Sequence, residues 1–487
     1  MGTKIQTDTS STPAAVVEAP LEQTVEVASP ATAPSKPKLW QRRRLQFGVG
    51  ALVALVIVAA LANNFVASQY TPEGAVRAYL GALQSGNAFA AWSQIQVSAP
   101  SQSATAMLTD QAALQAALAT AKPDFRSFDI TDTSDVDANT AQLAVTFDTS
   151  NGAKQAKFLV QRSGDKRFGF YPIWRMVVAP ALLTVTLPKG GGGVSVDGKA
   201  LALSAGKSTI AVLPLPHKVI FNATALLAQQ TVTVDAFLSV DQAIAYHPAF
   251  TDAGMVKART AVTRYFNDVC AKQSKAKPAQ VGCPQATDTY LPYSGQWHLV
   301  GDPTQGMVIT SDRDQNLSAV GHFQMDFAYP EDGVQGIRQV PAGGGYSAPL
   351  LLEGSNVTVG SVSKSDAAPA LDRPAGASDQ AAKDLVSKGF AQCAAVSAET
   401  VANCPQAAPD VIIANVHWGL NGDPVLGSTV TYDGQTGLLT VHGNFSMSVS
   451  YTWFGSPQNR SSYVTAYYAY LFWDGQALQL ITIEGDY

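Results

Sequence analysis

The segments Trp297-His-Leu-Val-Gly-Asp-Pro303 and Trp418-Gly-Leu-Asn-Gly-Asp-Pro424 are two versions of one motif, 121 residues apart (418 minus 297). Other residues recur in the same order at an offset of 121 or 122: Gly321, Phe323, Met325, Tyr329, Tyr346, Leu350 and Gly354 return as Gly443, Phe445, Met447, Tyr451, Tyr467, Leu471 and Gly475. Solenoid repeats are shorter, about 20 to 50 residues. The duplication therefore predicts two tandem domains.

The four cysteines lie at equivalent places in the two copies. Cys270 and Cys393 each end an amphipathic helical segment, while Cys283 and Cys404 each precede Pro-Gln. Four cysteines allow three pairings, and the repeated layout favours one disulfide within each copy. Each disulfide would stabilise its copy by ~3 kcal/mol in an oxidising compartment. A four-cysteine zinc site would need closer spacing, so we expect no metal and no cofactor.

Helical patterns come first and antiparallel strand patterns follow them, which predicts the α+β fold class. Thr71 begins a segment of helical period that Gly86 ends, and alternating apolar residues follow it. Asp197-Gly198 marks a tight hairpin within a small all-β module. The glycines at 190–193 lack the Lys-Ser/Thr ending of a phosphate loop, so we interpret them as a flexible connector.

The segment Arg42-Arg43-Arg44 precedes an apolar run from 47 to 62, which extends to Ala67 without an ionised side chain. About 20 such residues span a bilayer, and the cations before them keep the N-terminus in the cytoplasm. We therefore expect one transmembrane signal anchor, with all later domains extracytoplasmic. The alternative is a secretion signal cleaved after Ala62, but more than forty residues precede the apolar run.

The expected organisation is one transmembrane helix followed by a multidomain ectodomain of helix-then-antiparallel-sheet modules. Its parts are a disordered cytoplasmic tail (1–38), the anchor (39–68), an α+β domain (70–178), the small β module (180–237), repeat 1 (238–365) and repeat 2 (375–487). The formal net charge of −5 gives no electrostatic basis for binding nucleic acid.

Two stretches resemble envelope proteins. The residues TPEGAVRAYLGALQSGNAFAAW (71–92) resemble the start of nuclear-transport-factor-like domains that lie just outside bacterial membranes. Residues 255–487, with Cys-Pro before a Trp-bearing strand, resemble outer domains of actinobacterial membrane-anchored proteins of unknown function. The resemblance implies a cell-envelope setting and no particular activity.

Candidate catalytic groups do not form a recognisable set. His298 follows Trp297 whereas His417 precedes Trp418, so the copies share no histidine site. The Ser-x-x-Lys matches at Ser163 and Ser361 lack the companion motifs of penicillin-interacting enzymes. The aspartates of the two Gly-Asp-Pro turns are expected to bond their own backbone. We therefore predict no enzyme activity.

An aromatic cluster in repeat 2 is the candidate binding face, able to stack on sugar rings or on a partner protein. Its residues are Tyr467, Tyr468, Phe472, Trp473 and the nearby Trp453. The expected function is that of a membrane-anchored binding, sensor or scaffold protein that contacts a cell-wall glycan or another envelope protein. The alternatives are a cell-wall-directed hydrolase or transferase with an unrecognised site, and a subunit of a larger membrane complex.

Overall fold

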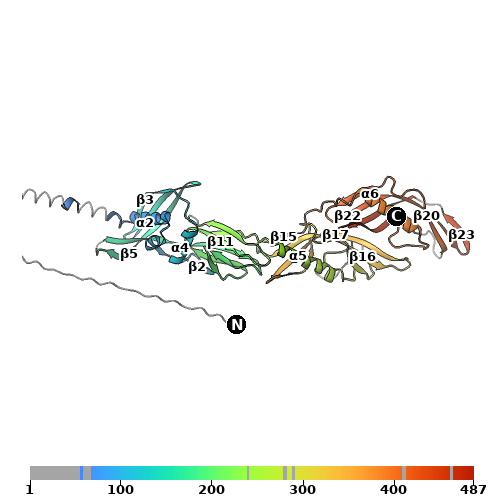
Figure 1. The fold of residues 1–487 in the computed structure, drawn as a ribbon, viewed down its shortest axis with the longest axis horizontal. Coiled ribbons are helices and arrows are strands. Elements are labelled where there is room, and N and C mark those ends of the chain that lie inside the picture. Colours follow the sequence, from blue (N-terminus) through green and yellow to red (C-terminus); the bar gives the residue numbers. More distant parts are fainter. Residues whose placement is uncertain are drawn as a thin grey trace, which may run out of the picture. The chain divides into compact units, whose positions relative to one another are not determined.

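The computed structural model describes residues 55–58, 67–169, 171–237, 241–277, 282–287, 291–407, 413–460 and 464–486 (Figure 1). The chain is multidomain and mostly β, with 48% strand and 18% helix in several sheets. It divides into two compact units, residues 1–67 and 68–487. Within the described residues no helix is long and apolar enough to cross a membrane. The predicted tail and most of the predicted anchor lie outside them.

The first domain of the second unit packs three helices against one sheet. Its helices are α2 (Pro72–Ser85), α3 (Ala88–Ser93) and α4 (Gln111–Thr120), and its strands, in spatial order, are β1 (Ile95–Val97), β6 (Tyr171–Val178), β5 (Gly152–Arg167), β4 (Thr140–Thr149) and β3 (Ser127–Asp137). Helix α2 begins where the sequence predicts, because the Thr71 hydroxyl accepts the Gly74 N–H. Gly86 ends it with φ 72°. The buried face of α2 shares one core with the sheet.

Two small sheets share the next core. One contains, in order, β13 (Asp241–Ile244), β7 (Ala181–Leu187), β10 (Gly206–Val212) and β2 (Ala106–Leu108); the other contains β12 (Gln230–Asp235), β11 (Pro216–Phe221), β8 (Val194–Val196) and β9 (Lys199–Leu201). Strand β2 comes from the first domain and pairs with β10 in parallel. The predicted hairpin at Asp197-Gly198 is confirmed, with φ of 50° and 81° at its two central residues.

Close packing, and not flexibility, explains the glycines at 190–193. A Cβ on Gly190 would overlap the Leu352 carbonyl oxygen, and one on Gly192 would overlap the Asn222 carbonyl oxygen. Only glycine permits backbones to approach so closely. The interpretation of this segment as a flexible connector is therefore wrong, because two of its glycines lie against other parts of the chain.

Each duplicated copy places one helix against an antiparallel sheet. Copy 1 contains α5 (Asp252–Tyr265), the π-helical turn η1 (Phe266–Cys270) and the strands β14 (Gln296–Leu299), β16 (Leu317–Pro330), β17 (Ile337–Glu353) and β18 (Asn356–Val359), with β15 (Val308–Ser311) on β16 and β19 (Ser363–Lys364) on β17. Copy 2 contains α6 (Asp379–Ala394) and the strands β20 (Ile413–Leu420), β22 (Leu438–Trp453), β24 (Val464–Trp473) and β25 (Leu478–Asp486), with β21 (Thr429–Asp433) and β23 (Ser456–Arg460) on β22.

The recurring motif residues satisfy equivalent buried polar groups in both copies. The Tyr346 hydroxyl donates to the Pro303 carbonyl oxygen at 2.8 Å, and the Tyr467 hydroxyl donates to that of Pro424 at 3.1 Å. The indole nitrogens of both motif tryptophans donate to backbone carbonyls. The Asp302 carboxylate accepts a backbone N–H two residues on, as predicted, and the aspartate of copy 2 does the same.

Disulfide bonds join Cys270 to Cys283 and Cys393 to Cys404, one within each copy as expected. The glutamine two residues after the second cysteine completes each loop, because its side-chain amide donates to the carbonyl of the first cysteine. The repeated Cys-Pro-Gln sequence therefore closes the loop in each copy twice, by the disulfide of its cysteine and by the hydrogen bond of its glutamine.

The π-helical turn accommodates one extra residue in copy 1. Phe390 and Cys393 of copy 2 are three residues apart, whereas Phe266 and Cys270 of copy 1 are four apart. The wider turn at Phe266–Cys270 keeps both side chains in the core. Each phenylalanine contacts the tyrosine of its own copy, with ring centroids 5.2 Å apart in copy 1 and 4.8 Å in copy 2.

Backbone and side-chain hydrogen bonds connect the two copies. The Asn403 side chain accepts the Gln339 N–H at 2.7 Å and donates to the Ile337 carbonyl. The His322 ring nitrogens lie 2.8 Å from the Gln435 carbonyl oxygen and 2.7 Å from that of Pro369. The copies therefore meet through specific polar contacts as well as through their sequence linker.

The duplicated tyrosine hydrogen bonds predict matched effects of two substitutions. Y346F and Y467F each leave a buried proline carbonyl without its donor, which should lower the free energy of unfolding of that copy by about 1–2 kcal/mol. Urea unfolding of the full chain, with domain-resolved hydrogen exchange, measures both. A decrease in the free energy of unfolding in only one of the two variants would contradict the equivalence of the two hydrogen bonds.

Candidate functional site

A groove of about 560 Å³ runs between helix α5 and strand β18 in copy 1. Helix α5 contributes Lys257, Ala261, Arg264 and Tyr265 among others, and the strand contributes all of 356–359. The turn η1 that follows α5 contributes Asp268. The helical residues recur at spacings of three and four, so they form one stripe along α5. A single helix face and a single strand therefore form the two walls.

Among the described residues, strand β18 is the last strand of its sheet, and its outer edge has no ladder partner. Its ladder with β17 continues to Gly360, whose N–H donates to the Pro349 carbonyl at 2.8 Å. In an antiparallel ladder, alternate residues bond their partner and the residues between them point away. Val357 and Val359 are those intervening residues, so their N–H and C=O groups face away from β17.

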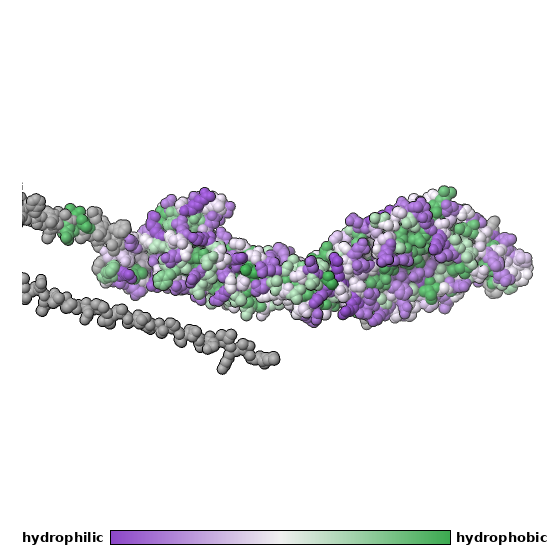
Figure 2. Space-filling model, viewed as in Figure 1, coloured by the Kyte–Doolittle hydropathy of each residue, from purple (hydrophilic) through white to green (hydrophobic). Residues whose placement is uncertain are grey.

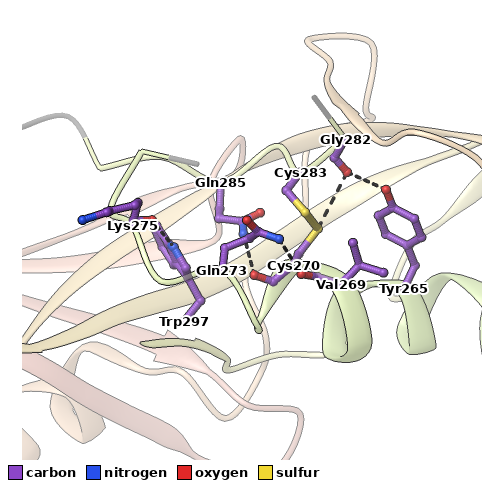
Figure 3. The surroundings of a disulfide bond; sticks show 9 residues. All are labelled: Tyr265, Val269, Cys270, Gln273, Lys275, Gly282, Cys283, Gln285 and Trp297. Atoms are coloured by element: carbon purple, nitrogen blue, oxygen red, sulfur yellow. Dashed lines mark hydrogen bonds between the residues drawn. A yellow bond between two sulfur atoms is a disulfide. The ribbon is translucent and has the colours of Figure 1, made fainter. Parts of the chain in front are cut away.

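Tyr265 forms one end of the groove, and the disulfide loop holds it there (Figure 3). Its hydroxyl donates to the Gly282 carbonyl oxygen at 2.9 Å. Gly282 immediately precedes Cys283, and a Cβ at this position would lie 2.9 Å from the tyrosine hydroxyl. A glycine is therefore required for the Tyr265 side chain to reach the loop.

Copy 2 is closed at the equivalent position. Counting back from Phe266 and Phe390 places Gly389 opposite Tyr265 in the alignment of the two helices. A Cβ on Gly389 would lie 2.6 Å from Leu480 Cδ2 and 3.0 Å from Ile483 Cδ1. Side chains of strand β25 therefore lie directly against this position of α6, whereas copy 1 has a tyrosine there that lines the groove between α5 and β18.

The charges along the groove are mainly positive. Arg264 is exposed on the helical stripe, and Lys257 donates its ammonium group to the Ser355 carbonyl beside β18. Asp268 pairs with Lys272 at 3.4 Å, which offsets its charge locally. Arg259 lies in an adjoining open depression on the same helix. An acidic or polar ligand matches this distribution of charge.

The predicted aromatic face in copy 2 does not form as a set. Tyr467 and Phe472 are fully buried, which excludes them from any exposed face. Tyr468 and Trp473 are half-buried, and Trp453 is 41% exposed at a hairpin. Leu471 and Phe472 follow each other in β24 and are both fully buried. The register shift beside them falls in β25, where Ile481 is skipped in the ladder.

The described residues form no large hydrophobic patch on the face drawn in Figure 2. Hydrophobic residues lie there in small groups among hydrophilic ones. Trp453 and Phe454 contact each other, with ring centroids 5.2 Å apart and Phe454 74% exposed. Scattered exposed rings of this kind are common on soluble domains, so they do not define a site on their own.

One histidine–carboxylate pair was missed by the sequence reasoning. His298 Nδ1 lies 3.1 Å from Asp326 Oδ1 across the β14–β16 ladder, with the histidine half-exposed and the aspartate buried. The Gln339 amide also donates to Asp326. Burial raises the pKa of the Asp326 carboxyl, against the lowering effect of His298 and Gln339. Neither His298 nor Asp326 lines the α5 groove.

The remaining predicted groups are structural or isolated. His217 is buried between the Asp197 carboxylate and the Leu213 carbonyl, which occupy both ring nitrogens. Ser163 lies in β5 and Ser361 follows β18, far apart in the chain. Within the described residues, no cluster of three His, Cys, Asp or Glu side chains could hold a metal ion.

Comparisons with known proteins add little to this geometry. No model of a known protein family matches the chain, and no curated protein matches it. One solved structure, an Ntf2-like protein involved in plasmid conjugation, is similar to the chain at 7% identity with a TM-score of 0.12. That likeness covers 40% of this chain and 80% of the other.

The raised pKa of Asp326 predicts a pH dependence of stability. The folded state binds the proton more tightly than the unfolded state, whose carboxyl titrates near 3.8. The stabilisation is complete below that value and is lost as the pH rises through the folded pKa. D326N keeps the hydrogen-bonding oxygen and does not titrate. Its stability relative to wild type should therefore rise with pH and then level off, as measured by urea unfolding. A difference independent of pH would contradict the prediction.

Proposed function

We propose that the protein is a single-pass envelope protein whose ectodomain binds another envelope component. The Arg triplet and the apolar run that follows it support one membrane span with the N-terminus in the cytoplasm. Two disulfides in the later domains support an extracytoplasmic setting, because such bonds persist in oxidising compartments. In this proposal residues 70–178 are a nuclear-transport-factor-like spacer, and the repeats are α+β binding modules.

The binding site of this proposal is the groove of copy 1, and its ligand is an extended peptide segment of a neighbouring envelope protein. The open edge of β18 beside helix α5 is the observation that carries the proposal. A peptide that adds a strand to a sheet edge gains main-chain hydrogen bonds, and the adjoining helix selects its side chains. The backbone groups of Val357 and Val359 provide the acceptors and donors.

Dimensions and charge define the peptide further. Strand β18 has four residues, which gives an edge of roughly 13 Å at about 3.3 Å per residue. Arg264 and Lys257 line the groove and favour a peptide that carries carboxylates. Tyr265 offers an aromatic surface for an apolar or planar side chain. The expected ligand is therefore a short, extended, acidic segment.

A hydrolase remains the second candidate because of the His298–Asp326 pair. A buried aspartate that orients a half-exposed histidine is the arrangement of a general base. The pair lies on the sheet outside the groove, and Asp326 also accepts from Gln339. A subunit role in a larger membrane complex is compatible with peptide binding, since the peptide would belong to another subunit.

The peptide proposal predicts a charge-dependent interaction specific to copy 1. The full chain in detergent is screened against displayed peptides of about ten residues, enough to exceed the groove at about 3.3 Å per residue. Selected peptides should be acidic, and R264E should weaken their binding by ~10-fold or more by fluorescence anisotropy. K388E is the matched control at the equivalent exposed position of α6 and should bind as wild type does.

Two results would contradict the proposal. Equal loss of binding in R264E and K388E would indicate a general charge effect rather than a site. Binding of acidic glycan fragments with no selected peptide would keep the groove as a site and exclude strand addition. Release of fragments from cell-wall material that H298A abolishes would instead support the hydrolase.

A further inference from the structure

The hairpin between β5 and β6 combines exposed cations with an exposed aromatic ring. Lys166 and Arg167 are exposed beside the turn, and Arg162 is exposed further along β5, against the single carboxylate of Asp165. Phe168 follows at the turn and is 69% exposed. The Arg167 guanidinium lies over the Phe168 ring, 5.8 Å from its centroid.

The backbone conformation at Phe168 is one that residues with a side chain rarely adopt. Its φ is 52°, in the left-handed region, which is unfavourable for a residue with a side chain. Glycine would relieve this strain, and Gly169 next to it already adopts positive φ. The large apolar side chain neither fills the core nor suits the turn, so its presence points to a contact outside the chain.

The turn end of this hairpin contacts the start of the second unit. The Tyr171 ring stacks on Tyr70, with centroids 5.0 Å apart and planes inclined by 14°. Tyr70 comes three residues after Ala67, where the proposed membrane span ends. Three residues cover about 10 Å when extended. The turn end of the hairpin therefore lies close in the chain to the point where the proposed span ends.

We infer that the β5–β6 hairpin docks onto the outer leaflet of the membrane that the protein spans, with Phe168 inserted among the lipid headgroups. The inference rests on the proposed membrane anchor. Apolar aromatic side chains insert at the boundary between headgroups and acyl chains, and cations beside them are attracted to anionic lipids. Three exposed cations and one carboxylate leave a net positive hairpin that fits an anionic lipid surface.

Docking gives the ectodomain a second attachment besides the anchor. A single helix allows the following domain to rotate freely about its link, whereas a second contact through Phe168 fixes which side of the first domain faces the lipid. The hairpin thereby limits the directions in which the repeats present their groove. The first domain acts as an oriented spacer rather than as a flexible tether.

The test places a fluorophore at the hairpin of the full chain in lipid. F168C adds one reactive thiol to a chain whose four cysteines are all in disulfides, and an environment-sensitive dye is attached there. F89C is the matched control, because Phe89 is 74% exposed in the same domain. It lies beyond α2, which has 14 residues and so a length of about 21 Å.

Both variants are reconstituted into liposomes of phosphatidylcholine and phosphatidylglycerol, with nitroxide-labelled lipid as quencher. The inference predicts strong quenching at position 168, little at position 89, and weaker quenching at 168 in K166E/R167E. Similar signals at 168 and 89 would overturn it. Extraction of the liposomes at alkaline pH reports separately on the anchor. A chain that resists extraction but shows no quenching loses only the hairpin inference, whereas an extracted chain loses the anchor as well.

Discussion

The carbonyl oxygen of Gly282 is the acceptor on which the geometry of copy 1 depends. It receives the Tyr265 hydroxyl from helix α5 and the Val362 N–H from the segment after β18. The neighbouring Cys283 is joined covalently to Cys270 at the end of the same helix. One short loop therefore fixes the helix, the edge strand and the tyrosine between them, and the groove is the space that this arrangement leaves.

In copy 2 the equivalent disulfide loop contacts copy 1. Asn403 takes the place of Gly282, and its carbonyl accepts the Ile483 N–H just as Gly282 accepts that of Val362. The asparagine side chain reaches β17 of copy 1 and joins the two domains. Duplication has thus produced one copy whose loop supports an open groove and one whose loop connects the repeats.

Local patterns predicted much of this structure, and long-range geometry explains what they missed. The capped helix after Thr71, the hairpin at Asp197-Gly198 and the disulfide within each copy depend on neighbouring residues. The groove is lined by Tyr265, where copy 2 has Gly389. The sequence does not show this difference directly, because the π-helical turn of copy 1 adds one residue between the helix and its cysteine. The His298–Asp326 pair depends on strand register. The membrane span remains a prediction, because most of it lies outside the described residues.

The most direct test of the central claim is amide hydrogen exchange along β18, resolved to single residues, with and without an acidic peptide selected on the full chain. Strand addition predicts that the peptide slows exchange at Val357 and Val359, whose N–H groups face away from β17, and leaves Thr358, already paired with Leu351, unchanged. Uniform protection along the strand, or protection at β25 instead, would contradict peptide binding at the open edge of copy 1.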